Sequence, residues 1–374
     1  MPDADMAKIV REVIVKTFFD LKQEVIARGL CHGCGGCVTF CTAINYGALK
    51  MEEDHVPRYR SVEKCIDCGL CYLICPAVGE MDEQVNRNVD WSAPMGRILQ
   101  VSIARATDKN IRDMATDGGA VTSLLLHLFD SGRIDGAIVS KQTHEGRQPW
   151  LATTRDDIIA AAGSHFDAMQ GVLQLGEKYS TYSPSAQALG SLMSQGLRKI
   201  AFVGTPCQIK SARKMQALKL VPSDAIKFYF GLFCTSNFEL DGDKTHTLEE
   251  IAGCTMAEVE KMNIKEDFML NLKDGRKINI PLEDLDFARR DACRFCDDFS
   301  AEYADLSFGG LGADHGWTAV VIRSPLGRAA FADAREKSLE IQSIDDHPGI
   351  DAGLITAIMQ SSKIKKEHAE NMTK

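Results

Sequence analysis

Two groups of four cysteines near the N-terminus have the spacing of iron-sulfur cluster ligands. They are Cys31, Cys34, Cys37 and Cys41, then Cys65, Cys68, Cys71 and Cys75, with Pro76 after the second group. Three thiolates placed three residues apart wrap one 4Fe-4S cube from a single loop, and a fourth, before a proline, reaches the neighbouring cube. The chain is therefore expected to carry electrons one at a time.

The same crossing rule assigns two ligand sets. One cluster takes Cys31, Cys34, Cys37 and Cys75, and the other takes Cys65, Cys68, Cys71 and Cys41. Zinc is the alternative. However, a zinc ribbon uses two CxxC pairs about 15 to 20 residues apart, whereas each group here has three cysteines at three-residue spacing and then a fourth. The spacing favours iron-sulfur clusters, although Thr42 follows Cys41 where a proline is usual.

A third cysteine constellation lies further along the chain. Its candidate members are Cys207, Cys234, Cys293 and Cys296. Cys207 stands where a predicted strand ends and a helix begins, and Cys234 ends the next predicted strand, so parallel pairing would bring both to one edge of a sheet. The residues leave open whether these thiols hold a third cluster with the CxxC pair or are buried as small hydrophobic side chains. For Cys254, which has no metal-like neighbour, burial is favoured.

A glycine turn before an apolar helix is a candidate anion site. Gly118 and Gly119 follow Thr116 and Asp117 and precede the apolar run 120–129. Backbone amides at a helix N-terminus bind phosphate groups. However, Thr116 or Asp117 is also a typical N-cap, and the residues alone favour that interpretation. The sequence has no GxGxxG dinucleotide fingerprint.

Few other residues point to specific chemistry. The run 309–312 contains three glycines after a predicted strand, which indicates either close backbone approach to a ligand or a tight turn. His127 is expected to pack in the core, and His32 lies within a cluster loop. His165 and His315 are free to meet a ligand, and Trp317 suits either the core or a stacking platform. No general acid or base is identified, so the catalytic residues are unknown.

Composition restricts the class of protein. The chain has 374 residues, 45% hydrophobic and 25% charged, which predicts more than one globular domain. A net charge of -9 without a basic stripe argues against a nucleic-acid binder. No signal peptide and no bilayer-spanning run is found. So many free thiolates require a reducing compartment, and we predict a cytoplasmic protein attached to a membrane only through a partner.

The periodicity of the sequence predicts five regions. Residues 1–29 are a docking helix, because apolar residues recur at helical spacing and end near Gly29. Residues 30–79 form the ferredoxin module, with a hairpin over 48–59. Residues 80–98 have loop composition and are predicted to be a linker. A larger domain over 99–345 is followed by a C-terminal helix and tail over 346–374.

Within the larger domain, strand-like and helix-like runs alternate. Strands are predicted over 99–106, 134–140, 199–203, 226–233, 305–308 and 318–323, and helices over 120–129, 208–218 and from Gly327. A hairpin, 268–272 with 277–280, is predicted around Asp274-Gly275. The chain is therefore multidomain, with an α/β pattern behind a small α+β module.

Several segments together resemble the family of coenzyme F420 hydrogenase/dehydrogenase beta subunits. They are Thr116-Asp117-Gly118-Gly119-Ala120-Val121-Thr122, Val203-Gly204-Thr205-Pro206-Cys207-Gln208-Ile209, Gly231-Leu232-Phe233-Cys234, and Cys293-Arg294-Phe295-Cys296-Asp297-Asp298-Phe299 continuing to Arg323. The resemblance covers about 102–327 and is specific as a set. It implies FAD bound at the Gly118-Gly119 turn and a 4Fe-4S cluster held by the four inner cysteines. The residues it places at the flavin are Thr116, Asp117, Gly118, Gly119, Thr122, Gly204, Thr205, Pro206, Gly309 and Gly310.

The resemblance also implies an activity. Coenzyme F420 trades hydrides, whereas iron-sulfur clusters accept single electrons, and FAD converts between the two. The expected function is hydride exchange between F420 and FAD, with single electrons passing through three clusters to or from a partner subunit. Hydrogenase, formate dehydrogenase, heterodisulfide reductase and membrane dehydrogenase complexes are the partner types implied. The alternatives are a stand-alone ferredoxin-dependent flavin reductase, similar to the 7-hydroxymethyl chlorophyll a reductases, and a pure electron-transfer subunit.

Overall fold

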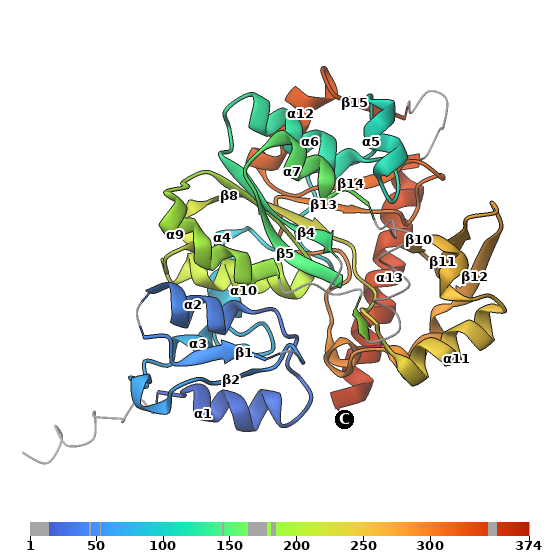
Figure 1. The fold of residues 1–374 in the computed structure, drawn as a ribbon. Coiled ribbons are helices and arrows are strands. Elements are labelled where there is room, and N and C mark those ends of the chain that lie inside the picture. Colours follow the sequence, from blue (N-terminus) through green and yellow to red (C-terminus); the bar gives the residue numbers. More distant parts are fainter. Residues whose placement is uncertain are drawn as a thin grey trace, which may run out of the picture.

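The computed structural model describes residues 15–44, 46–52, 54–143, 146–163, 178–180, 185–342 and 350–373. Three parts are visible in Figure 1: a small cysteine-rich module, a central sheet covered by helices on both faces, and a three-stranded sheet beside it. This arrangement confirms the expected mixed α/β architecture with a ferredoxin-type module in front. The predicted region 1–14 of the docking helix lies outside the described residues.

The central sheet has eight strands in the order β15-β3-β14-β13-β8-β7-β4-β5. Their bounds are β3 Gln100–Ala106, β4 Gly136–Thr143, β5 Gly146–Ala152, β7 Ile200–Gly204, β8 Ile226–Leu232, β13 Leu306–Gly309, β14 Thr318–Ile322 and β15 Leu339–Ile341. The four strands β4, β7, β8 and β13 are parallel, and the remaining pairs are antiparallel. The predicted strands are all present, whereas β5 and β15 were not anticipated.

Side chains alternate between two cores because successive residues of a strand point to opposite faces. In β7, Ala201 and Val203 join the core on one face, while Ile200 and Phe202 join the core on the other. The first core is covered by α5 (Lys109–Met114), α6 (Ala120–Asp130), α7 (Arg155–Ala160) and α12 (Pro325–Arg335). The second is covered by α10 (Pro206–Ala217), α9 (Leu192–Gln195) and the 3-10 helix Ser185–Ser191.

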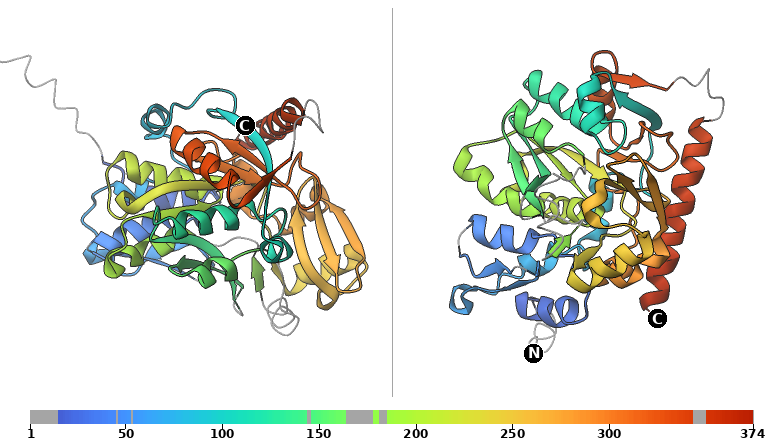
Figure 2. Two further views of the ribbon diagram at one scale, coloured as in Figure 1. Left: turned by 90° about the horizontal axis from the view of Figure 1, so that it is seen from above. Right: turned by 45° about the vertical axis from the view of Figure 1, so that its right-hand side comes forward.

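The cysteine-rich module packs on the second face of the sheet, as Figures 1 and 2 show in blue. It contains α1 (Phe18–Leu21), a π-helix (Lys22–Ile26), α2 (Gly36–Ile44), β1 (Leu49–Met51), β2 (Pro57–Tyr59) and α3 (Leu70–Leu73). The predicted hairpin is confirmed by β1 and β2. Phe40 and Ile74 belong to the same core as α10, and Thr39 Oγ1 donates to Ala186 O at 2.9 Å. The module is therefore fixed against the sheet by apolar and polar contacts.

The expected linker is not entirely loop. Its residues Asp82–Asn88 form α4, whose Val85 is buried in the core under α10. Loop-forming residues dominate its composition, but one apolar side chain and an ion pair suffice to hold a short helix: Lys210 Nζ lies 2.8 Å from Asp82 Oδ2. This segment therefore tethers the module to the sheet.

The remaining elements lie to one side of the central sheet. Antiparallel strands β10 (Val259–Ile264), β11 (Asp267–Leu272) and β12 (Lys277–Pro281) form a small sheet with α11 (Gly242–Ala252) against it, and β6 (Lys178–Ser180) pairs with β9 (Glu239–Asp241). The predicted hairpin around Asp274 is β11-β12. The long helix α13 (Ile350–Thr373), red in Figures 1 and 2, runs down one side of the molecule. Among the described residues, no helix combines the length and apolar character needed to cross a bilayer.

Candidate functional site

A cavity of about 390 Å³ opens at the carboxyl ends of the parallel strands. The end of β4, the residues after β7, β8 and β13, the start of α6 and the strand β10 all contribute to its wall. Its volume is within the range of sites that bind small molecules. Its position is the usual one for ligands of open α/β sheets.

Most of the residues implied for the flavin line this cavity. They are Thr116, Asp117, Gly119, Thr122, Gly204, Thr205, Gly309 and Gly310. Gly118 and Pro206 are their sequence neighbours and are not in the wall. At Gly310 a Cβ atom would lie 2.6 Å from Lys265 Cε and 2.8 Å from Asp117 Oδ2, so a larger residue would displace these two side chains. Segments far apart in the sequence thus converge on one space, with backbone exposed where a ligand needs close approach.

The start of α6 differs from the expected N-cap. Gly119 is the N-cap residue, with a left-handed φ of 75°, and it has no side chain to bond the first-turn amides. The Asp117 carboxylate instead accepts from Asn263 Nδ2 at 3.0 Å and lies 3.3 Å from Lys265 Nζ. Because β10 holds Asp117 in this way, the first turn of α6 meets the cavity without a side-chain cap.

Substitution of Gly119 tests this local geometry. Gly119→Ala is expected to lower the free energy of unfolding by about 1–2 kcal/mol, because a left-handed conformation disfavours any Cβ atom. The added atom would also lie 3.0 Å from Ile111 Cγ2. Gly353→Ala is the matched control, since that glycine lies in α13 with open space around its Cβ, and alanine there should stabilise by about 0.5–1 kcal/mol. Urea unfolding midpoints that move in the same direction for both variants would contradict the assignment.

The four inner cysteines lie close together, and one of them, Cys234, lines the cavity. Cys207 opens α10 directly after β7, Cys234 follows β8, and Cys293 and Cys296 lie in and after the 3-10 helix Asp291–Phe295. Burial raises the pKa of the Cys207 thiol well above its usual value, and the nearby Cys296, Cys34 and Cys234 raise it further. Burial raises the pKa of Cys234 to about 12, with Cys293 and Cys296 adding to the effect. These thiols are near enough for their charges to interact.

The chemistry of this donor set fits an iron-sulfur cluster. The Asn237 backbone N–H donates to Cys293 Sγ at 3.4 Å, and Asn237 Nδ2 donates to Cys234 Sγ at 3.3 Å. Such donors stabilise anionic sulfur and tune a cluster's potential. Burial disfavours free thiolates here, so a bound metal would have to supply the compensating positive charge. Across the described part of the chain, no three His, Cys, Asp or Glu side chains form a site for a single metal ion.

Four thiols of the N-terminal module surround a cavity of their own. Its wall includes Cys31, Cys34, Cys37 and Cys75. Burial raises the pKa of Cys75, and the Cys34 and Cys31 thiols raise it further. The pKa of Cys31 is raised to about 11, again mainly by burial. The chain thus brings Cys75 of the second group beside the first group.

The other four thiols form a more exposed group. The pKa of Cys71 is raised to about 12, mainly by burial. The charges of Cys68 and Cys65, and to a smaller extent that of Cys41, raise it as well. Cys68 is exposed to solvent. By contrast, Cys34 interacts electrostatically with Cys207 of the inner group. The three thiol groups therefore run from the cavity, through the first set, to the surface of the module.

Comparison with known proteins decides the family. Residues 101–175 and 197–347 match the models for the N-terminal and C-terminal parts of the "Coenzyme F420 hydrogenase/dehydrogenase, beta subunit". The beta subunit of the coenzyme F420 hydrogenase of Methanococcus voltae is 32% identical over 282 residues, covering 73% of this chain and 95% of that protein. The chain belongs to the family of coenzyme F420 hydrogenase/dehydrogenase beta subunits. The resemblance found in the sequence is thereby confirmed.

Two further relatives of known type match most of this chain. One subunit of the F420H2 dehydrogenase of Methanosarcina mazei is 26% identical over 337 residues, 88% of each chain. The F420-reducing NiFe hydrogenase complex from Methanosarcina barkeri contains a chain that is 27% identical, with a TM-score of 0.64, covering 75% of this chain and 93% of that one. Residues 23–76 match a "4Fe-4S dicluster domain", which is the cysteine-rich module.

Basic side chains beside the cavity of this F420 family member were missed by the sequence analysis. Lys265 lines the cavity, and Lys261 donates to Ala115 O. The pKa of His315 is lowered, mainly by the charge of Lys277. Burial and the charges of Lys265 and Lys261 lower it further. These cations therefore gather at one side of the site. The lysines come from a sheet far along the chain, and nothing in their local pattern distinguishes them from solvated charges.

The other candidate residues have simple roles. His127 is buried and bonds Asp333 Oδ2 at 2.8 Å, so it is packed as expected. Cys254 is buried in the core of the three-stranded sheet, also as expected. Trp317 packs at the edge of a core with the Arg105 guanidinium 4.3 Å from its ring centroid. His165 lies outside the described residues.

Proposed function

We propose that this chain exchanges a hydride between coenzyme F420 and FAD and passes single electrons through three 4Fe-4S clusters to or from a partner subunit. One observation carries the proposal. Cys234 lines the same cavity as the Gly119, Gly204 and Gly310 turns and groups with the other inner thiols. A site for a two-electron cofactor and a site for a one-electron cofactor therefore share a wall.

The residues of the chain suit each cofactor. The uncapped first turn of α6 offers backbone amides to phosphate groups of FAD. Cys207, Cys234, Cys293 and Cys296 would hold the inner cluster, and the two module sets would hold the others with the crossing fourth ligands. Bound FAD supplies the conversion between hydride and single electrons, and the clusters supply one-electron storage. Lys261, Lys265 and Lys277 would attract the acidic part of F420.

The order of the clusters follows from burial. The inner thiols adjoin the set containing Cys34, and the set containing Cys68 reaches the surface. Val62 and Ile66 beside that outer set are exposed apolar side chains. We infer that electrons enter or leave here, at a surface where a partner subunit docks. The names of the relatives place them in hydrogenase and dehydrogenase complexes, which supports a partner of that type.

The test uses the full chain loaded with FAD and iron-sulfur clusters under anaerobic conditions. F420 absorbance is followed while a reduced one-electron dye supplies electrons. Reduction of F420 to F420H2 takes two electrons from the dye and two protons from water, and we expect the absorbance to bleach only when FAD is bound. A protein whose FAD is reduced by the dye but never bleaches F420 would contradict the proposal and favour the stand-alone reductase. A protein that binds no FAD would instead be an electron-transfer subunit.

A further inference from the structure

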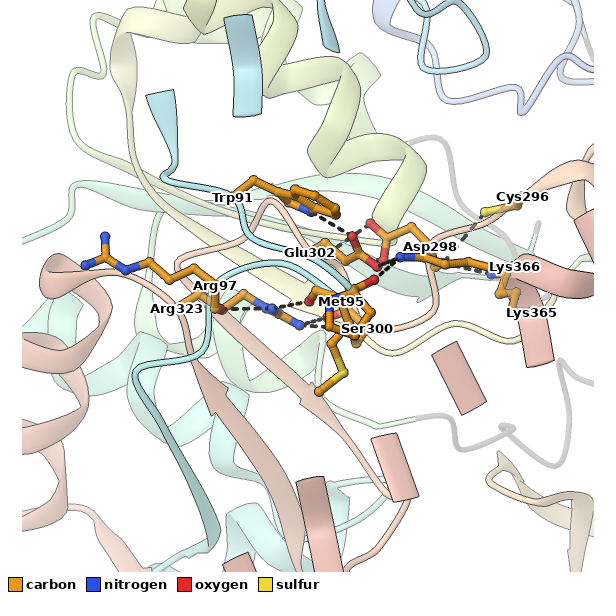
Figure 3. A network of polar contacts seen from close by, with 11 residues as sticks. Trp91, Met95, Arg97, Cys296, Asp298, Ser300, Glu302, Arg323, Lys365 and Lys366 are labelled. Carbon is orange, nitrogen blue, oxygen red and sulfur yellow. Dashed lines mark hydrogen bonds and ion pairs between the residues drawn. The ribbon is translucent and has the colours of Figure 1, made fainter. Parts of the chain in front are cut away.

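Lys365 is a buried lysine in the second half of α13. The residue is 8% exposed, and its Nζ donates to Cys234 O at 2.5 Å and to Asp298 O at 2.9 Å. Figure 3 shows it pointing to the segment that holds Cys296 and Asp298. Both carbonyl groups belong to the loops that carry inner cysteines. The long helix therefore places an ammonium group against the backbone of the loops that carry the inner cysteines.

This ammonium group interacts electrostatically with the inner cysteines. The charged groups that interact with it are the thiols of Cys296, Cys234 and Cys293 and the carboxyl group of Asp298. Within the described residues, no ion pair joins Lys365 to a carboxylate. The anions around Lys365 are therefore mainly the thiols that the proposed function assigns to the inner cluster.

Hydrogen bonding alone does not account for a lysine at this position. Two carbonyl acceptors can be satisfied by a neutral amide donor, whereas removing a charged ammonium from water costs several kcal/mol. That cost is offset when the ammonium faces anionic sulfur at short range in a medium of low dielectric constant. α13 also lies beyond the segments 101–175 and 197–347 matched by the family models.

We propose that the Lys365 ammonium group raises the reduction potential of the inner cluster, which makes that cluster the preferred first acceptor of single electrons from the cavity. The proposal rests on the third cluster of the proposed function. Reduction adds a negative charge to the cluster, and a fixed positive charge beside it stabilises the reduced form more than the oxidised form. Lys365 acts through the cluster and touches neither flavin nor F420.

The neighbouring lysine provides a matched control. Lys366 is on the same helix but turns away, with Nζ 2.8 Å from Glu302 Oε1 and 5.8 Å from the centroid of the Trp91 ring. Figure 3 shows the two ammonium groups directed to different partners. Removing either lysine removes one positive charge from α13, but of the two only Lys365 bonds the backbone carbonyls of Cys234 and Asp298.

The experiment is an EPR-monitored redox titration of the holoprotein with K365Q, K365M, K365R and K366M. The inner signal is the one that Cys207→Ala removes. We expect K365Q, whose amide still donates to carbonyl groups, to lower the equilibrium constant for reducing the inner cluster by at least about tenfold, which is 59 mV for one electron. K365M should lower it at least as much, while K365R and K366M should stay near the wild-type value.

The outcomes separate this inference from the proposed function. If Cys207→Ala removes no signal and no iron, there is no inner cluster and the proposed relay fails. If the inner signal is present and K365Q titrates like the wild type, the relay stands and the role of Lys365 is overturned. That role is also overturned if K365R shifts as far as K365Q, because then the charge is not the cause.

Discussion

Cys207→Ala is expected to leave about eight irons per chain where the wild-type protein holds about twelve, since each 4Fe-4S cube contains four. Cys207 opens α10 at the end of β7 and faces the charges of Cys296 and Cys234. Alanine removes one of four ligands, and the remaining three cannot complete the thiolate set of a cube. Dye-driven bleaching of F420 should fall by more than the roughly 10–100-fold that loss of an outer hydrogen-bond partner costs a metal site.

The control is another buried cysteine. Cys254→Ala alters the core of the three-stranded sheet, where Cys254 packs with Met256 and Leu248. This variant should keep about twelve irons and its F420 activity. Iron and acid-labile sulfide analysis of the two purified holoproteins gives the comparison. An iron content near eight in the wild type, unchanged by Cys207→Ala, would remove the inner cluster from the proposal.

The parts of the site that local spacing determines were predictable. A CxxCxxC loop constrains three thiols within one turn of chain, so the two module groups follow from sequence alone. The nearness of Cys207 and Cys234 followed from a topological rule, because both stand after parallel strands of one sheet. In each case the predicted relation depends on neighbouring residues or on adjacent strands.

Relations set by tertiary packing were not predictable. Lys365 lies in a run of lysines on a helix, a pattern typical of a solvated face, and only the packing of α13 buries it. Asp117 is a typical N-cap residue by type, but β10 supplies Asn263 and Lys265 as competing partners from about 150 residues away. The preference of an aspartate for the N-cap is weaker than these two side-chain contacts. Gly119 is therefore the N-cap residue of α6.

Arg323→Met is expected to be the most destabilising single substitution in the network of Figure 3. The Arg323 guanidinium is 2% exposed and donates to Ser307 Oγ at 2.8 Å, Met95 O at 2.9 Å and Ser300 Oγ at 2.8 Å. Burial lowers its pKa to about 10, opposed by the charges of Asp298 and Glu302, so it remains protonated at neutral pH.

Removing this guanidinium leaves the buried acceptors without their donor, and Asp298 and Glu302 lose one of the cations near them. Loss of one partner from such a buried charge network costs about 3–5 kcal/mol. For a domain of this size the melting temperature should fall by on the order of 10 °C.

Arg97→Met is the control, because the Arg97–Asp90 pair, at 2.6 Å, is on the surface and contributes at most about 1 kcal/mol. Thermal melts of the holoproteins that coincide for the two variants would show that the network does not hold the 298–302 segment. Since that segment carries the Asp298 carbonyl and directly follows Cys296, its loosening should also lower the occupancy of the inner cluster in Arg323→Met and leave it unchanged in Arg97→Met.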